Sequence, residues 1–384
     1  MCGILFFDCG ATGADSQAIL SDHASLLTHR GPEASCATVF QNEDRHVLAF
    51  CRLAIVSTDA NNHGMQPFDL GNVSIVCNGE IYNYKTLIES SPSINLRSDV
   101  DVVLHTVCAP FYRDNNVDRL LAATAALDGD FAFVCTDGKR VVAGRDPLGV
   151  RPLFYGMKGS KVVAFSSEAK ALVGAPGIDR IAVFPPGHVY VSGSHLLRYH
   201  EVMPSASSFS SSSASVDPLV VKEFHRLLSE AVSKRVLHSE RPVALLCSGG
   251  IDSSAVASLV ARNADAWGGW KPADIKVFTM KYRSGHSDDA FYAELLCRHL
   301  GFALEVVEFG PEDLSDETLR SVIRSCETCD PNTIRAAIPM WLLARHITTK
   351  TDVKVILSGE GADELLGGYG YFRLAPNEGA SADE

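Results

Sequence analysis

The chain has 384 residues, enough for two or three domains, and its 46% hydrophobic and 21% charged residues are ordinary for a globular protein. Its net charge of −12 argues against nucleic acid or an anionic membrane as the main partner. We expect no secretory signal and no transmembrane helix, because the first residues lack a basic segment and no apolar run approaches about 20 residues. The eleven cysteines, scattered through apolar segments, indicate reduced thiols and a cytoplasmic protein.

The first distinctive residue is Cys2, which directly follows Met1. Removal of Met1 would give Cys2 both a thiol and a free α-amine, whose reference pKa values are about 8.5 and about 7.7–8.0. The amine can then serve as the base for its own side chain, which makes Cys2 a candidate nucleophile. An isolated Met-Cys pair is more often an accident of the start site, and the motifs that follow in the chain decide between these interpretations.

The first 190 residues predict many short strands and few helices, which is an α+β layout dominated by sheets. Strands are expected at residues 3–8, 47–56, 73–77, 131–136, 141–144, 153–156 and 162–165, and helices at 16–28 and 99–108. A Ser-rich stretch at 204–218 cannot bury a core and is interpreted as a linker. A phosphorylated tail is the alternative for this stretch.

Beyond residue 218 strands and longer helices alternate, which predicts a doubly wound α/β domain with a buried parallel sheet. Strands are expected at 243–247, 275–280, 304–309 and 353–357, and helices at 219–236, 255–262, 289–300, 316–325 and 333–347.

The strand at 243–247 runs directly into the sequence SGGIDSS at 248–254, where a helix begins. Two glycines let backbone N–H groups close around phosphate oxygens, and the helix N-terminus adds its dipole. The loop is not a Walker A motif, because that motif's lysine is absent. Its pattern, SGGxDS, is that of the PP-loop ATP pyrophosphatases, which cleave ATP between the α- and β-phosphates. A Gly-rich turn that binds nothing is the alternative.

A second glycine-rich loop, SGEGADELLGGY at 358–369, follows the strand at 353–357. Ligands of a doubly wound sheet bind beyond the carboxyl ends of its strands, so the two loops can face one nucleotide. The carboxylates of Glu360, Asp363 and Glu364 would repel one another unless a cation, an amine or ammonia neutralises them. Cys326 and Cys329 have CxxC spacing, which could mark a redox or zinc site, but no second pair accompanies them and we interpret the spacing as coincidence.

Taken together, these motifs resemble one family, the glutamine-hydrolysing asparagine synthetases. In the first half the matching blocks are Met1-Cys2-Gly3-Ile4, His29-Arg30-Gly31-Pro32, Arg52-Leu53-Ala54-Ile55-Val56, Gln66-Pro67, Asn78-Gly79-Glu80-Ile81-Tyr82-Asn83, Ser98-Asp99, Leu127-Asp128-Gly129-Asp130-Phe131-Ala132 and Arg145-Asp146-Pro147-Leu148-Gly149-Val150-Arg151-Pro152-Leu153. In the second half they are SGGIDSS, Asp330 with Thr333-Ile334-Arg335-Ala336, Pro339-Met340 and SGEGADELLGGY. The order and spacing of so many blocks are far more specific than any single block.

The resemblance implies two domains and one fold for each. Residues 2–190 resemble a class II glutamine amidotransferase, an α+β N-terminal-nucleophile fold of stacked antiparallel sheets with helices. Residues 219–384 resemble an α/β PP-loop asparagine synthetase domain with a parallel sheet, and 204–218 would be the linker between the two.

For the glutaminase half the resemblance implies a role for each matching residue. Cys2 would attack the glutamine side-chain amide, while Asn78 and the backbone N–H of Gly79 would stabilise the oxyanion. Arg52 would bind the glutamine α-carboxylate, and Glu80 with Asp99 would bind the α-ammonium. The glutamine-binding residues would be Arg52, Leu53, Ala54, Ile55, Val56, Asn78, Gly79, Glu80 and Asp99.

For the synthetase half the resemblance implies ATP and Mg²⁺ as cofactors. ATP would be bound by Leu246, Ser248, Gly249, Gly250, Asp252, Ser253, Met280, Ser358 and Gly359. Asp252 and Asp363 would bind Mg²⁺, and Glu360 would assist at the adenylate and ammonia step. The implied enzyme is a carbon–nitrogen ligase with glutamine as amido donor: aspartate becomes β-aspartyl-AMP, and ammonia from glutamine, carried through an internal tunnel, displaces AMP. A homodimer is compatible with the sequence.

Three departures from the family pattern are mild: Glu33 stands at a usual Asp position, and Cys247 and Cys329 stand at common Leu and Tyr positions. A larger departure is that the resemblance stops at Glu384, before a lysine that the family uses to neutralise the reacting phosphate. Two other functions therefore stay open: a glutaminase with an impaired synthetase half, and a regulatory pseudoenzyme that binds glutamine or ATP. The β-lactam synthetase branch shares the architecture, but we expect it to lack the N-terminal cysteine.

Overall fold

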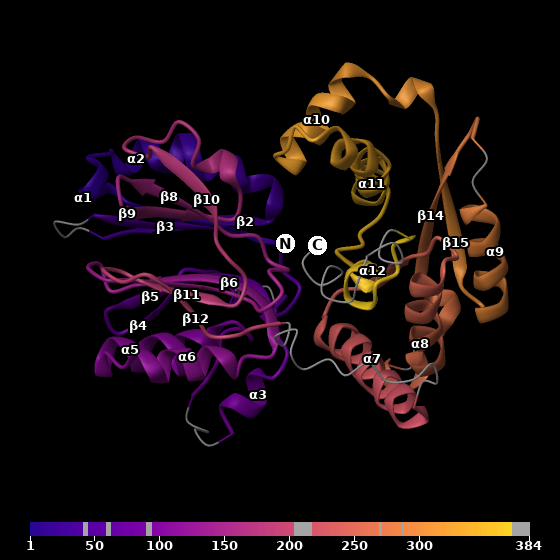
Figure 1. The fold of residues 1–384 in the computed structure, drawn as a ribbon, viewed down its shortest axis with the longest axis horizontal. Helices are drawn as coiled ribbons and strands as arrows, with labels where there is room; N and C mark the ends of the chain where they lie inside the picture. The colour runs from indigo at the N-terminus through magenta and orange to yellow at the C-terminus, as the bar shows by residue number, and fades with distance from the viewer. Residues whose placement is uncertain are drawn as a thin grey trace. The chain divides into compact units, whose positions relative to one another are not determined.

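Two units, Met1–Pro204 and Ser205–Glu384, make up the chain, whose structure is a computed structural model (Figure 1). It describes residues 1–40, 45–58, 63–89, 94–202, 217–268, 271–285 and 288–370. The Ser-rich linker predicted at 204–218 falls almost entirely on residues outside these ranges. Among the described helices, none has the length and apolar character needed to cross a membrane.

The first unit contains two six-stranded sheets, and all of their strand pairs are antiparallel. The first sheet has the order β10-β8-β9-β1-β3-β2, with bounds β1 Gly3–Asp8, β2 Ala34–Val39, β3 His46–Arg52, β8 Phe154–Lys158, β9 Lys161–Ser166 and β10 Arg180–Val183. The second sheet has the order β12-β11-β7-β6-β5-β4, with bounds β4 Phe68–Leu70, β5 Val73–Ile81, β6 Gly129–Thr136, β7 Val141–Arg145, β11 His188–Val191 and β12 Leu196–Arg198.

Every residue of β1 is buried, because each face of its sheet is covered. Ile4 and Phe6 pack with Val76 and Val134 of the second sheet, so these side chains form the core between the two sheets. Leu5 and its alternate neighbour Phe7 join a separate core under the helices. Successive side chains of a strand point to opposite faces, so the fully apolar sequence of β1 serves both cores.

Short helices cover the outer faces of this sheet pair, which gives four layers (Figure 1). The first sheet is covered by α1 Cys9–Thr12, α2 Ser16–Ala18, a π-helical turn Ile19–His23 and the 3₁₀ segments Ala24–Arg30 and Ala169–Ala171. The second sheet is covered by α4 Asp101–Val103, the π-helical turn Leu104–Cys108, α5 Ala109–Asp114 and α6 Val117–Ala125, with α3 Tyr84–Leu87 packed beside them. The expected α+β stack of antiparallel sheets with helices is confirmed.

Three expected elements of this unit differ from the structure. The helix predicted at 99–108 begins at Asp101, becomes a π-helical turn at Leu104–Cys108 and continues as α5. The strand predicted at 47–56 ends at Arg52, and residues 53–56 leave the sheet to line a cavity described below. The helix predicted at 16–28 is split into a short α-helix, a π-helical turn and a 3₁₀ segment that ends at Arg30. Apolar patterning predicts that a segment is buried, but hydrogen bonds to other parts of the chain decide where it ends.

The second unit contains one parallel sheet with the order β15-β14-β13-β16. Its strands are β13 Val243–Leu246, β14 Lys276–Tyr282, β15 Ala303–Phe309 and β16 Val355–Leu357. Its helices are α7 Pro218–His238, α8 Ile251–Gly268, α9 Asp289–Leu300, α10 Asp316–Cys326, α11 Pro331–Lys350 and α12 Ala362–Leu366, with 3₁₀ turns at Pro272–Asp274 and Pro311–Asp313.

Helices cover both faces of this sheet, as expected for a doubly wound domain. Leu245 and Val277 pack with residues of α7, α8 and α9 on one face. Ala244 and Phe278 pack with residues of α11 on the other. From β13 the chain proceeds to β14 and β15 on one side and then returns to add β16 on the other side of β13. The direction of strand addition thus reverses beside β13, and ligands bind at such a switch point.

We expect the core between the two sheets of the first unit to tolerate little loss of volume. Phe6 is 1% exposed and contacts the rings of His46 and Phe165. Phe6→Ala should lower the free energy of unfolding of this unit by about 3–5 kcal/mol, because it removes buried apolar surface and leaves a cavity. Denaturant titration would measure the loss. Leu148→Ala, at an exposed position of the same unit, is the control and should change the stability by less than about 0.5 kcal/mol; equal losses would contradict this account of the core.

Candidate active sites

Cys2 precedes β1 and faces the segment that follows β3. Its sulfur accepts a hydrogen bond from the backbone N–H of Leu53 at 3.4 Å and lies 3.6 Å from the carbonyl oxygen of the same residue. Burial raises the pKa of the Cys2 thiol, so the thiol needs a nearby base to become a nucleophile at neutral pH. The α-amine, here carried by Met1, is also buried and lies near Arg151 and Arg30, and its pKa is lowered to about 6. An amine in these surroundings is therefore a free base at neutral pH.

An ion-pair network holds the backbone of Cys2 in place. Arg30 donates from Nε to the carbonyl oxygen of Cys2 at 2.9 Å and from Nη1 to Glu168 Oε1 at 2.9 Å. Glu168 also contacts His29 at 3.1 Å and Lys170 at 2.7 Å. Burial alone would raise the pKa of Glu168, but hydrogen bonds from His29, Lys170 and Arg30 outweigh burial and lower it to about 2. Neither the role of Arg30 nor the presence of Glu168 at this site was predicted from the sequence.

Arg52 is the last residue of β3 and is 4% exposed. Its Nη2 donates to the carbonyl oxygen of Ser57 at 2.6 Å, which folds the following segment back over the guanidinium. Glu33 accepts a hydrogen bond from the backbone N–H of Ala54 at 2.9 Å, so the residue that departs from the family pattern supports this segment. These contacts explain why residues 53–56 line a cavity instead of continuing the strand.

Asn78 and Gly79 lie side by side in β5, on the other sheet. Asn78 is 1% exposed, and its side-chain nitrogen has no hydrogen-bond partner among the residues that the structure describes. Such an orphaned donor is costly unless a ligand accepts from it. Gly79 packs so closely on the backbone of Asp130 and Phe131 that a Cβ atom would clash. The strand is fixed one residue earlier, because the side-chain amide of Gln66 hydrogen-bonds both backbone groups of Cys77.

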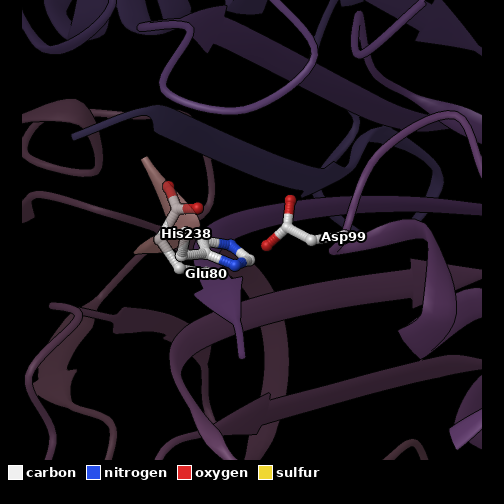
Figure 2. A group of neighbouring side chains, drawn as sticks. All are labelled: Glu80, Asp99 and His238. Carbon is white, nitrogen blue, oxygen red and sulfur yellow. The ribbon is translucent and has the colours of Figure 1, made fainter. Parts of the chain in front are cut away.

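Two carboxylates, those of Glu80 and Asp99, lie near each other in this unit, and Figure 2 shows both as sticks. One oxygen of Glu80 is within 4.8 Å of one oxygen of Asp99. Asp99 accepts hydrogen bonds from the N–H of Ile81 at 2.8 Å and from the hydroxyl of Ser98 at 2.8 Å, which fix its orientation. Paired carboxylates of this kind attract an ammonium group.

These groups converge on one small cavity. Of the residues predicted to act on glutamine, its walls include Cys2, Arg52, Leu53, Ala54, Ile55, Val56, Gly79, Glu80 and Asp99. Asn78 is not among the wall residues, although it precedes Gly79 in the same strand. The open space of this cavity is about 30 Å³, much smaller than that of the second cavity described below.

A larger cavity of about 410 Å³ lies in the second unit, beyond the carboxyl ends of β13, β14 and β16. Its volume is in the range of small-molecule sites. Of the residues predicted for ATP and metal, its walls include Leu246, Ser248, Gly250, Asp252, Ser253, Met280, Ser358, Gly359, Glu360 and Asp363. Gly249 is not in the wall; its φ of +78° turns the loop, and it packs against the backbone of Ala293 in α9. Apolar residues that the sequence analysis did not assign to the nucleotide complete the wall: Phe278, Ala336, Pro339, Met340 and Leu343.

The two glycine-rich loops touch in this cavity. A Cβ atom on Gly359 would lie 2.7 Å from the backbone nitrogen of Ser253, so only glycine permits the contact. The hydroxyl groups of Ser248 and Ser253 are 3.2 Å apart at the mouth of the first loop. Helix α8 starts at Ile251, directly after the glycines, which places its N-terminal N–H groups at the cavity.

The charged residues of this wall are all acidic. Five carboxylates line it, and none of the described wall residues is a lysine or arginine; the five are Asp252, Asp289, Glu360, Asp363 and Glu364. A triphosphate cannot approach such a wall without a neutralising cation. Oxygen donors in this number are the ligands that Mg²⁺ prefers, so the donor set fits that ion.

Comparison with known proteins identifies the family of both halves. The glutamine amidotransferase domain family matches residues 1–190, and the asparagine synthase family matches residues 223–383. Similarity to solved structures is weaker: the glutamine phosphoribosylpyrophosphate amidotransferase from B. subtilis is 15% identical with a TM-score of 0.42, covering 88% of this chain and 92% of that one.

The relatives with curated names agree with one another. The probable glutamine-hydrolyzing asparagine synthetase of Acanthamoeba polyphaga mimivirus is 32% identical, over 98% of this chain and 69% of its own length. Asparagine synthetase 3 of Arabidopsis thaliana is 35% identical over 98% of this chain and 62% of its own, and the Schizosaccharomyces pombe protein is 34% identical over 100% and 68%. This chain thus spans about two thirds of the length of these relatives. Because identity extends over both halves in one order, the chain belongs to the family of glutamine-hydrolysing asparagine synthetases.

Proposed function

We propose that the protein makes asparagine from aspartate, using ATP and ammonia released from glutamine. Residues 2–190 would form the glutaminase domain and residues 219–384 the synthetase domain. The observation that carries the proposal is the convergence of Cys2, Arg52, Gly79, Glu80 and Asp99 on one cavity, in a chain that also holds a PP-loop cavity. The cytoplasm suits this chemistry, because all eleven cysteines are free thiols and a reducing compartment would keep them so.

Glutamine hydrolysis would begin with proton transfer from the thiol of Cys2 to its own α-amine, exposed by removal of Met1. The buried surroundings that lower the pKa of the Met1 amine to about 6 would keep this amine uncharged and basic at neutral pH. The sulfur then attacks the amide carbon, and the side-chain nitrogen of Asn78 and the N–H of Gly79 donate to the oxyanion. The amide nitrogen takes the proton and leaves as ammonia, and water hydrolyses the thioester to glutamate.

The α-carboxylate and the α-ammonium of glutamine would each be held by side chains of the opposite charge. Arg52 can receive the α-carboxylate once its bond to Ser57 is exchanged for a bond to the substrate, because a guanidinium offers a second edge for bidentate contact. Glu80 and Asp99 would take the α-ammonium. Holding both groups would place the side-chain amide at Cys2.

In the second unit the loop at 248–254 would hold the pyrophosphate part of ATP, and the apolar wall at Phe278, Met280 and Met340 would hold adenine. Asp252 and Asp363 would hold Mg²⁺, which neutralises phosphate charge when bound. Cleavage between the α- and β-phosphates would transfer AMP to the β-carboxylate of aspartate and release pyrophosphate. Glu360, on the same wall, would receive a proton when ammonia attacks the adenylate.

Cys2→Ala should reduce glutamate release from glutamine by about 10³-fold or more, because the attacking atom is lost. Glutamate formation and labelling by a glutamine-mimicking electrophile are the measurements, and the mass of the purified protein shows whether Met1 has been removed. Cys36→Ala, at an exposed thiol of the same unit, is the control and should keep normal hydrolysis. Hydrolysis by Cys2→Ala at the normal rate would refute the assignment of the nucleophile.

Glu168→Gln should lower kcat for glutamine hydrolysis while leaving KM nearly unchanged, because Glu168 positions Arg30 and thereby Cys2 without touching glutamine. It should also change the dependence of stability on pH. The pKa of Glu168 is depressed to about 2 in the folded protein, so its contribution is present above about pH 4.5 and is lost as pH falls toward 2. That contribution is on the order of 3 kcal/mol.

Denaturant titrations between pH 7 and pH 3 would test this second effect. The free energy of unfolding of the wild-type protein should fall steeply as the pH is lowered. Glu168→Gln should be less stable than the wild type at pH 7, and its stability should fall less between pH 7 and pH 3. Glu201→Gln, whose carboxylate forms an exposed ion pair with Arg198, is the matched control and should follow the wild type. Parallel curves for the wild type and Glu168→Gln would contradict the role given to this network.

ATP consumption should yield AMP and pyrophosphate in an aspartate-dependent reaction. Asp252→Asn should slow pyrophosphate release by about 10²–10³-fold, the typical cost of losing one electrostatic contact to the transition state. Asp265→Asn is the control, because Asp265 lies on the same helix, α8, but is exposed and outside the cavity wall. Formation of ADP and phosphate would show that the loop at 248–254 has been misinterpreted.

A further inference from the structure

Cys247 occupies an unusual position between the sheet and the nucleotide loop. It follows β13 directly and precedes Ser248, and its backbone N–H still donates to the carbonyl oxygen of Phe278 at 2.9 Å. It is 2% exposed, yet it lines the 410 Å³ cavity, so a small molecule in the cavity can reach it.

A second thiol lies beside it. Cys297 is on α9, 1% exposed, in the same apolar core cluster as Cys247, and its thiol is hydrogen-bonded to that of Cys247. The contact is part of a wider one: Ala293, one turn before Cys297, abuts Gly249 of the loop. One face of α9 therefore packs on the base of the loop and carries Cys297 there.

Further donors surround the Cys247 sulfur. Besides Cys297, the backbone N–H of Gly249 and the hydroxyl of Ser253 hydrogen-bond to it. The hydrogen bond with Cys297, followed by those from Gly249 and Ser253, outweighs burial and lowers the pKa of Cys247, whereas the same hydrogen bond and burial raise the pKa of Cys297. The lowered pKa favours the thiolate form of Cys247, and the thiolate is the reactive form of a cysteine.

We propose that Cys247 is a modification site for peroxides and small disulfides, that Cys297 resolves it to an intramolecular disulfide, and that bound nucleotide protects both. With hydrogen peroxide, the Cys247 sulfur attacks one oxygen, the O–O bond breaks, and hydroxide leaves and is protonated to water. Cys297 then attacks the sulfenic sulfur, the S–S bond forms and a second water leaves. The two thiols are oxidised by two electrons and one peroxide is reduced.

Protection by nucleotide follows from shared space and shared donors, and it rests on the proposed nucleotide site. The N–H of Gly249 and the hydroxyl of Ser253 belong to the loop expected to hold pyrophosphate, so the thiolate and the phosphates compete for them. An S–S bond of about 2.05 Å is shorter than any contact between hydrogen-bonded sulfurs. The disulfide therefore draws the Cys247 sulfur toward α9 and away from the loop, which changes the loop's shape.

The natural comparison is another pair of thiols in the same chain. Cys108 and Cys135 are also hydrogen-bonded to each other, but both are 0% exposed in the core of the first unit. Neither belongs to the wall of the two cavities described above. Cys108 and Cys135 are thus a hydrogen-bonded thiol pair that a small molecule in either cavity does not reach. They should stay reduced under conditions that oxidise Cys247 and Cys297.

The experiment treats the full chain with hydrogen peroxide, or with oxidised glutathione, with and without ATP and Mg²⁺. Peptide mass mapping should find a disulfide between Cys247 and Cys297, formed about tenfold more slowly with saturating ATP. After oxidation, ATP should bind about tenfold more weakly, the effect of losing one strong hydrogen bond, and dithiothreitol should restore binding. Cys297→Ala should bind ATP normally before oxidation; with oxidised glutathione it should carry glutathione on Cys247.

Three results would overturn the proposal. The first is that Cys247 and Cys297 stay free while the exposed Cys36 and Cys326 are oxidised. The second is that the disulfide forms equally fast with bound ATP. The third is that Cys326→Ala, the control at an exposed thiol, abolishes the effect on ATP binding as Cys297→Ala should. Failure to bind ATP before oxidation would instead contradict the proposed nucleotide site, and a mapped disulfide would then still support the thiol pair.

Discussion

The glutaminase half depends on the packing of two sheets against each other. Cys2 enters β1 in one sheet, whereas Asn78 and Gly79 lie in β5 of the other. The distance between the proposed nucleophile and the proposed oxyanion donors is therefore set by the apolar side chains between the sheets, such as Phe6, Val76 and Val134. A reaction that needs atoms placed within a few tenths of an ångström is held by a layer that takes no part in it.

The synthetase half uses a different constraint for the same purpose. Its loops need no long-range anchor, because each follows a strand of one parallel sheet and the strands end at one edge. The order of strand addition reverses beside β13. The connections that leave β13 and β16 therefore run in different directions, which leaves room for a ligand at the carboxyl ends of these two strands. The close contact of Gly359 with Ser253 then shapes the site from backbone alone. The side chains that line the cavity supply its negative charge and the apolar wall proposed to hold adenine.

Local sequence was enough to predict elements whose pattern is self-contained. The strand Gly3–Asp8 and the helix Asp289–Leu300 lie at the predicted residues. An apolar run and a helical repeat of apolar residues are both visible within a short stretch of sequence, without knowledge of distant partners. The loops after β13 and β16 were predicted from their glycines, and the wall residues fell on one cavity as the doubly wound order requires. Glu168 was missed because its partner Arg30 is 138 residues away and nothing nearby marks the pair. The end of β3 at Arg52 was missed for a similar reason: the strand stops where the N–H of Ala54 donates to Glu33 and the guanidinium of Arg52 donates to the carbonyl oxygen of Ser57.

The acidic wall of the larger cavity makes it a filter for charge. If the cavity binds nucleotide as proposed, a bare triphosphate would meet five carboxylates and be repelled, whereas a nucleotide that arrives with its cation would bring the neutralising charge with it. Occupancy would then follow the concentration of the metal–nucleotide complex instead of total nucleotide. A fall in free divalent cation would empty the cavity even while nucleotide is abundant, and no change in protein conformation would be needed to transmit that signal.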